Sequence, residues 1–224
     1  MHALDRPVWA SLTTHHLLLG EGGALARKYL PEINRFASAR FDSGDAQVAL
    51  ARLVGPGEQV YILQVPAIPV PSGLRAAKTA MGVQMIATRP LLAESDDQIE
   101  LLTEADAPAM LALATLTEPG PFFLRTHQMG RFLGIRRQGR LAAMAGERMR
   151  FPGHTEVSGV CTHPDFRGQG LARRLSAAVT AAIQGRGDQA FLHAWANNTA
   201  AITLYRGLGF ELRAEVNVAV LERV

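Results

Sequence analysis

One short segment has the residue types that suit an anionic ligand: Arg167, Gly168, Gln169, Gly170, Leu171 and Ala172. An apolar, strand-like stretch precedes it, and an amphipathic helical pattern follows from Gly170. Glycines let backbone N–H groups converge without Cβ obstruction, and a helix N-terminus carries roughly half a positive charge. Arg167 adds a full charge. The segment therefore predicts a site for a pyrophosphate.

Two familiar phosphate loops do not fit this segment. The three-glycine spacing of the Rossmann fingerprint is absent, and no Gly-Lys-Ser/Thr run follows as in a P-loop. A plain strand-to-helix turn would explain one glycine, but two glycines beside an arginine favour an anion site. A second glycine loop, at Gly20, Gly22 and Gly23, is interpreted as a turn that enters a helix over residues 24–29, after a possible strand at 17–19.

Two sets of residues in the second half form a recognisable pattern. The first is Val160-Cys161-Thr162-His163-Pro164 followed by Arg167-x-x-Gly170-x-Ala172, and the second is Asn198-x-x-Ala201-x-x-Leu204-Tyr205-x-x-x-Gly209-Phe210. The first resembles the acetyl-CoA-binding motif of the GNAT superfamily of N-acetyltransferases, and the second resembles that superfamily's next motif at the expected distance. The resemblance covers residues 98–213 in layout and is specific over residues 156–210.

The resemblance implies that acetyl-CoA is the cosubstrate. Its pantetheine arm would pair with the backbone of Val160, Cys161 and Thr162, and its pyrophosphate would lie on residues 167–172. A backbone N–H near Val160 or Cys161 would stabilise the tetrahedral oxyanion. Because these contacts use main-chain groups, Cys161 is interpreted as a small buried hydrophobe rather than a reactive thiol.

Tyr205 and Asn198 are seven residues apart, about two helical turns, so both face the same side of a short helix. The resemblance implies that Tyr205 is the general acid that protonates the leaving thiolate; the alternative is an aromatic core residue. Asn198 either binds the pantetheine or caps the helix.

Glu156 is the candidate general base. It lies four residues before Val160 on the same predicted strand, similar to the position where some GNAT members carry a glutamate that acts on the amine directly or through water. The alternative is a solvent-facing strand carboxylate. His193 is interpreted as structural. The resemblance implies that Glu147 and residues 122–127 lie near the entry of the acceptor.

Composition limits the class of protein. Of 224 residues, 48% are hydrophobic and 19% charged, which is too apolar for a disordered chain. Cys161 is the only cysteine, so a disulfide within the chain and a site of several cysteines are excluded; no metal site is expected, and the cytoplasm fits best. No run of about 18 apolar residues indicates a membrane helix. No basic cluster interleaved with aromatic residues indicates nucleic acid binding.

Hydrophobic patterns predict the elements that position these residues: a helix over 45–53, strands over 59–65 and 98–102, a helix from the capping pair Thr103 and Asp106 towards Leu116, hairpin strands over 132–137 and 141–150, a strand over 155–162, a helix from Gly170 to Gly185, a strand over 191–195, and a short helix ending at Gly207. The order strand, helix, strand, helix, strand in the last part predicts an α/β sheet with a ligand loop at a strand's carboxyl end.

The resemblance implies a mixed α/β, GNAT-like fold: a central twisted mixed sheet flanked by helices, with an additional N-terminal α/β region. We expect a GNAT domain over residues 96–224 and a separate region over 1–95. That region either covers the acceptor side, forms a degenerate second GNAT-like module, or mediates formation of a homodimer.

The expected function is direct transfer of an acetyl group from acetyl-CoA to a primary amine of a small molecule or peptide, without a covalent enzyme intermediate. The principal alternative is a non-catalytic module that binds or senses acyl-CoA. A third class is an interaction or nucleic-acid-binding protein that shares only the fold.

Overall fold

The computed structural model describes residues 2–91 and 96–224. Its α-helices are α1 (Pro7–Leu12), α2 (Gly44–Leu53), α3 (Ala107–Thr117), α4 (Leu171–Gly185) and α5 (Thr199–Gly207). Its strands are β1 (Gly20–Gly22), β2 (Ala26–Tyr29), β3 (Ala37–Ala39), β4 (Gln59–Gln64), β5 (Leu74–Ala87), β6 (Ile99–Leu102), β7 (Phe132–Arg137), β8 (Arg140–Phe151), β9 (His154–Thr162), β10 (Gln189–Trp195) and β11 (Phe210–Arg223).

Eight strands form one mixed sheet in the order β4-β11-β5-β10-β9-β8-β7-β6. Only β9 and β10 run parallel, and every other neighbouring pair is antiparallel. The strand pair that carries the predicted cofactor motif is therefore the parallel pair, with α4 as its crossover. This confirms the expected mixed α/β class with a central mixed sheet.

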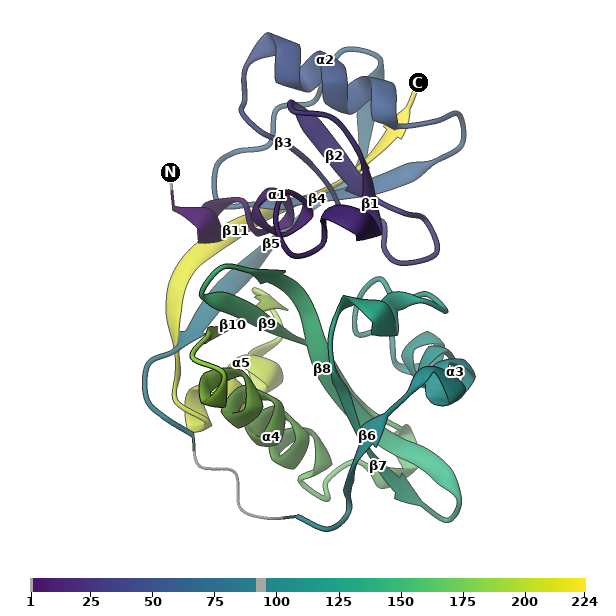
Figure 1. Cartoon of the computed structure of the whole chain (residues 1–224), viewed down its shortest axis with the longest axis vertical. Coiled ribbons are helices and arrows are strands. Elements are labelled where there is room, and N and C mark those ends of the chain that lie inside the picture. Colours follow the sequence, from purple (N-terminus) through teal and green to yellow (C-terminus); the bar gives the residue numbers. More distant parts are fainter. Residues whose placement is uncertain (1, 92–95) are drawn as a thin grey trace.

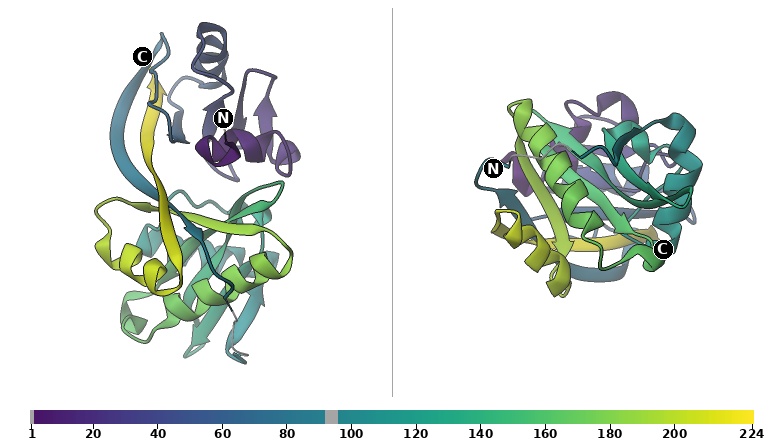
Figure 2. Two further views of the ribbon diagram at one scale, coloured as in Figure 1. Left: turned by 90° about the vertical axis from the view of Figure 1, so that its left-hand side faces the viewer. Right: turned by 90° about the horizontal axis from the view of Figure 1, so that it is seen from below.

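Two 14-residue strands, β5 and β11, join the two ends of the molecule. They pair antiparallel along almost their whole length, from Leu74↔Arg223 to Ala87↔Phe210. Figures 1 and 2 show this curved pair running from the part that holds α2 to the part that holds α4 and α5. Because both strands are continuous, the two parts share one sheet.

Helices α3 and α4 cover opposite faces of the sheet. Met144 of β8 packs with the α3 residues Met110 and Leu113, whereas its neighbours Ala143 and Ala145 pack with residues of α4. Successive strand residues point to opposite faces, so this alternation places the two helices on either side of β8 and β9. Figure 1 shows the same arrangement.

The N-terminal part adds a small antiparallel sheet in the order β1-β2-β3, on which α2 packs. Helix α1 lies against the end of β8, where Val8 and Leu12 join a core with Phe151 of β8 and Leu63 of β4. This part therefore packs directly on the sheet that carries the predicted site.

Most predicted elements are present, and two predictions are wrong. Residues 24–29 are not a helix: the chain reverses after β1, and Ala26–Tyr29 forms β2 with mostly buried residues. Leu17–Leu19 is a 3₁₀ turn and not a strand. β5 was not predicted from the sequence, and its first half is largely exposed on both faces.

The expected boundary between two domains at residue 95 remains a prediction. Strands β4 and β5 come before this boundary in the chain, yet they belong to the same sheet as β9 and β10. Among the residues that the structure describes, no helix is both long and apolar enough to span a membrane.

Candidate functional site

The two parallel strands separate as they approach the predicted cofactor motif. β9 and β10 pair only from His154↔Gln189 to Val157↔Leu192. Beyond that point β9 stays with β8, while His193 and Trp195 of β10 pair only with β5. A cavity of about 760 Å³ lies where they diverge, and residues of both strands line it.

A bulge in β9 marks this point of divergence. Ser158 pairs with Gly146 and Cys161 with Met144, so Gly159 and Val160 together face the single residue Ala145. Gly159 has φ +63°, a left-handed conformation that favours glycine. Because a bulge leaves the extra residue outside the ladder, backbone groups of β9 become available to a ligand in the cavity.

The predicted anion loop lies at one end of the same cavity. Gly168 and Gly170 have φ +77° and +71°, and open space surrounds both Cβ positions, so the backbone conformation is what requires glycine. The first turn of α4 begins with the Arg174 N–H bonded to the Gly170 carbonyl at 3.1 Å. Helix geometry leaves the amides before Arg174 without intrahelical acceptors, so they are available to bind an anion beside Arg167.

The structure brings the predicted cofactor-binding residues together. All of them except Gln169 line the cavity: Val160, Cys161, Thr162, Arg167, Gly168, Gly170, Leu171, Ala172 and Asn198. The Thr162 hydroxyl is buried and has no hydrogen-bond partner within residues 2–91 and 96–224. It is thus one polar group that a ligand in the cavity could satisfy.

Tyr205 of α5 also lines this cavity and is 7% exposed. Its ring packs edge-on against Phe210, with centroids 5.9 Å apart, and burial raises the pKa of its hydroxyl to about 12. Asn198 caps α5, since its side-chain oxygen accepts a hydrogen bond from the Ala201 N–H at 3.1 Å. Burial raises the pKa of Cys161 to about 11, which keeps its thiol protonated at neutral pH.

Glu156 is completely buried and is not among the residues that line the cavity. One carboxylate oxygen accepts a hydrogen bond from Arg148 Nε at 2.8 Å, and the other accepts one from Arg148 Nη2 at 2.6 Å. Burial alone would raise the pKa of Glu156, but the charge and hydrogen bonds of Arg148, together with the hydrogen bond of His193, lower it to about 2. The solvent-facing alternative for Glu156 is therefore wrong, and its predicted role as base stays a prediction.

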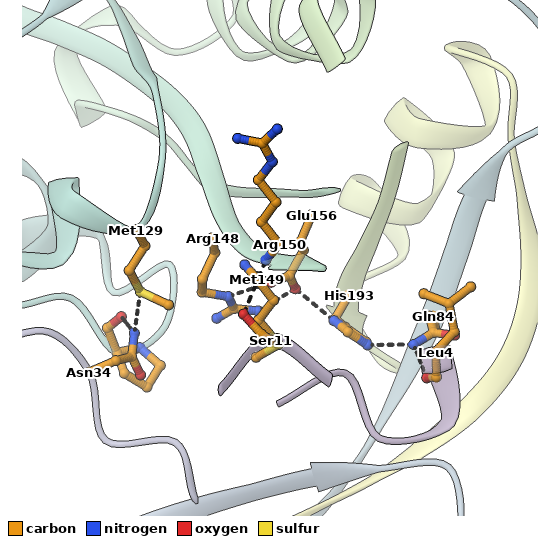
Figure 3. A network of polar contacts seen from close by, with 11 residues as sticks. Leu4, Ser11, Asn34, Gln84, Met129, Arg148, Met149, Arg150, Glu156 and His193 are labelled. Carbon is orange, nitrogen blue, oxygen red and sulfur yellow. Dashed lines mark hydrogen bonds and ion pairs between the residues drawn. The ribbon is translucent and has the colours of Figure 1, made fainter. Parts of the chain in front are cut away.

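His193 continues this network toward the N-terminal segment, as Figure 3 shows. Its Nδ1 lies 2.7 Å from a Glu156 oxygen, and its Nε2 lies 2.9 Å from the Gln84 amide nitrogen. Gln84 accepts from Arg213 through its oxygen and donates to the Leu4 carbonyl through its nitrogen. The Nδ1 proton of His193 therefore donates to Glu156, and its Nε2 lone pair accepts from Gln84.

Several cavity residues were not predicted from the sequence. Phe36, Tyr61 and Leu63 come from the first 95 residues, Glu118 follows α3, and Arg148 comes from β8. Glu118 has φ +49°, which is uncommon for a residue other than glycine, and its position before Pro119-Gly120 was the only local signal. Of the expected acceptor-entry residues, Glu147 is bound to Arg186 at 2.8 Å outside this cavity, and Phe122 lines a smaller neighbouring one.

Comparison with known proteins confirms the fold that the resemblance implies. Residues 132–219 match the model of the family described as FR47-like protein. A crystal structure of a GNAT-family protein from Novosphingobium aromaticivorans is 42% identical, covers 100% of both chains, and superposes with a TM-score of 0.94. No curated protein matches the chain.

More distant structures share the fold over nearly the whole chain. A GCN5-related N-acetyltransferase from Kribbella flavida is 20% identical, with a TM-score of 0.68, over 98% of this chain and 96% of that one. A GCN5-related N-acetyltransferase-like protein from Streptococcus suis is 17% identical, with a TM-score of 0.62, over 99% of this chain and 96% of that one. The N-terminal part is thus included in both alignments.

Proposed function

The chain belongs to the GNAT family of acetyltransferases, and on that basis we propose that it transfers the acetyl group of acetyl-CoA directly to a primary amine of a small molecule or peptide. The observation that carries this proposal is that one cavity, between β9 and β10, is lined by both the anion loop and Tyr205. Its volume, about 760 Å³, lies within the range of small-molecule sites.

The residues of the cavity fit acetyl-CoA in three ways. Arg167 and the free amides of α4 suit the pyrophosphate, and the backbone at the Gly159 bulge suits the amides of the pantetheine arm. The unpartnered Thr162 hydroxyl lies along the same strand. Acetyl-CoA supplies the thioester, whose carbonyl carbon is the electrophile.

The reaction forms a C–N bond and breaks a C–S bond. The amine nitrogen attacks the thioester carbonyl, and a backbone N–H near Val160 stabilises the oxyanion of the tetrahedral intermediate. When the C–S bond breaks, the electron pair stays on sulfur and Tyr205 donates its hydroxyl proton toward it. Since the pKa of Tyr205 is about 12 and that of a thiol is roughly 8.5, complete transfer is uphill. Tyr205 therefore contributes mainly a strong hydrogen bond to the developing thiolate.

The proton of the acceptor ammonium requires a base. Both Glu156 oxygens are bonded to Arg148 or His193, so in place of the predicted role as base we assign Glu156 the positioning of those two side chains. Glu118 is the only carboxylate among the described residues that line the cavity. We assign to Glu118 the binding of the ammonium and the removal of its proton, directly or through one water.

The first 95 residues supply the wall at the acceptor side. Phe36, Tyr61 and Leu63 line the cavity together with Val216 and Val218 of β11. Of the three roles expected for this region, covering the acceptor is the one that these contacts support. Cytoplasmic location, where acetyl-CoA is available and a lone buried cysteine stays reduced, is part of the same proposal.

A panel of amines, amino acids and peptides with acetyl-CoA tests this function, with release of free thiol as the measurement. Turnover with any acceptor supports the transferase. Tight binding of acetyl-CoA without any thiol release would favour the non-catalytic acyl-CoA-binding alternative instead.

A further inference from the structure

One nitrogen of the Arg148 guanidinium, Nη1, lies beside Gly120, which also lines the cavity; a Cβ on Gly120 would lie 4.0 Å from it. Nε and Nη2 are both bonded to Glu156, whereas Nη1 has no hydrogen-bond acceptor in the described part of the chain. One face of the guanidinium lies over Phe36, 4.9 Å from the ring centroid. The residue is 9% exposed and lines the cavity, so Nη1 is the part of it that a ligand there can reach.

The orientation of this nitrogen is fixed before any ligand arrives. Glu156 holds one edge of the guanidinium through two hydrogen bonds, and His193 holds Glu156 from its other side (Figure 3). A planar, clamped guanidinium loses little conformational freedom when it donates a further hydrogen bond. Hydrogen bonds to a charged donor are stronger than those between neutral groups, so a ligand that supplies an acceptor to Nη1 gains affinity.

The charge of the pair decides which acceptor fits. The positive charge of Arg148 is already balanced by the ionised Glu156. A second carboxylate placed here would leave one negative charge uncompensated in a buried site, which is costly. A neutral carbonyl oxygen satisfies Nη1 without that cost.

We propose that the acceptor is an amine with a neutral carbonyl on the adjacent carbon, as in an α-amino amide or a peptide N-terminus, and that Arg148 Nη1 binds that carbonyl. Phe36, Tyr61 and Leu63 then face the acceptor's side chain, which is apolar. This inference rests on the proposed acetyl transfer and names the acceptor class for the same site.

Matched acceptors test the proposal. For each of alanine, leucine and phenylalanine, the α-amino amide, the free amino acid and the corresponding amine without the carboxyl carbon are compared by kcat/KM. We expect at least one amide to exceed both its amino acid and its simple amine by about tenfold or more, the effect of one hydrogen bond to a charged group. A dipeptide amide is added to each series, and its kcat/KM relative to that of the α-amino amide distinguishes a peptide N-terminus from a small amide as the acceptor.

Other results of this panel would overturn the proposal. Simple amines that match the amides in every series would show that no carbonyl is bound, and amino acids that exceed the amides would show that the site takes a carboxylate. If no member is acetylated while calorimetry shows acetyl-CoA binding, this acceptor class is wrong and the cofactor site stands. If acetyl-CoA does not bind at all, the proposed function fails as well.

A double variant assigns the preference to Arg148. Arg148→Met with Glu156→Gln removes both charges together and so leaves no unpaired buried ion. We expect the ratio of kcat/KM for amide over simple amine to fall from tenfold or more to about one. The matched control, Arg150→Met with Asp188→Asn, removes an ion pair between β8 and the residue that precedes β10, outside the cavity, and should keep the ratio. An unchanged ratio in the folded double variant would contradict the assignment to Arg148. If the double variant does not fold, the acceptor panel with the unmodified protein tests the proposal.

Discussion

Glu156 of β9 holds Arg148 of β8 through two hydrogen bonds, 2.8 and 2.6 Å long, with both side chains in the interior. The pair lies beside the cavity between β9 and β10, and only Arg148 reaches it. A carboxylate that two strands enclose in this way serves first to orient the guanidinium. Its ionisation is therefore coupled to the stability of the fold.

Acid should destabilise the protein through this pair. The pKa of Glu156 is about 2 in the folded protein, whereas a glutamate without these contacts, as in the unfolded chain, has a pKa of about 4.5. The unfolded state therefore binds the proton more readily. The stabilisation is complete above pH 4.5 and is lost as the pH falls toward 2; its size is on the order of 3 kcal/mol. Urea unfolding across this range measures it. The Arg148→Met, Glu156→Gln variant lacks this titration and should show a shallower pH dependence; an equal dependence would contradict the buried ion pair.

Substitution of Gly170 by Asp should weaken acetyl-CoA binding by at least about tenfold, or roughly 1.4 kcal/mol. The new side chain adds a negative charge beside the proposed pyrophosphate site, at a residue with φ +71°. Calorimetry measures the affinity. Gly139→Asp is the control, because Gly139 has φ +73° and equally open surroundings in the turn between β7 and β8. Equal affinities of the two folded variants would remove the anion-site assignment.

The sequence allowed the cofactor side of the site to be predicted because its signals are local. The left-handed glycines, the amphipathic pattern of α4 and the Asn198 cap each act within one turn or loop. Such features depend little on the rest of the chain. The structure places all of the predicted cofactor-binding residues except Gln169 around one cavity.

The parts that could not be predicted depend on distant partners. Residues 24–29 have helix-forming side chains, but pairing of β2 with β3 and burial of Tyr29 override that local preference. β5 has no clean alternation, because its two halves lie in different environments of the sheet. The low pKa of Glu156 arises from Arg148 across a strand pair whose irregular register no sequence pattern reveals.

Tyr205→Phe should lower kcat by about 100-fold and leave acetyl-CoA affinity within about threefold. The substitution removes the hydroxyl that we propose bonds the leaving sulfur, and it keeps the ring that packs on Phe210. The defect should shrink with acyl thioesters whose thiol has a lower pKa, since a better leaving group needs less assistance. Parental turnover, measured where chemistry limits the rate, would make Tyr205 a packing residue.

Glu118→Gln should lower kcat/KM at neutral pH by about 100-fold, the low end for one acid–base group. The defect should diminish above the pKa of the acceptor amine, because the amine then arrives without its proton. Glu104→Gln is the control, since that carboxylate precedes α3 and lies outside the cavity. A defect of the same size at every pH would mean that Glu118 only shapes the loop.

Mass spectrometry with isotopically labelled acetyl-CoA tests the central claim, direct transfer within the cavity between β9 and β10. The pKa of Cys161 near 11 makes that thiol a poor nucleophile, so the protein incubated without acceptor should carry no label. With an accepted amine, the label should appear as an amide in the product, in equal amount to the released thiol. A labelled enzyme that passes its acetyl group to the amine at the rate of turnover would contradict direct transfer.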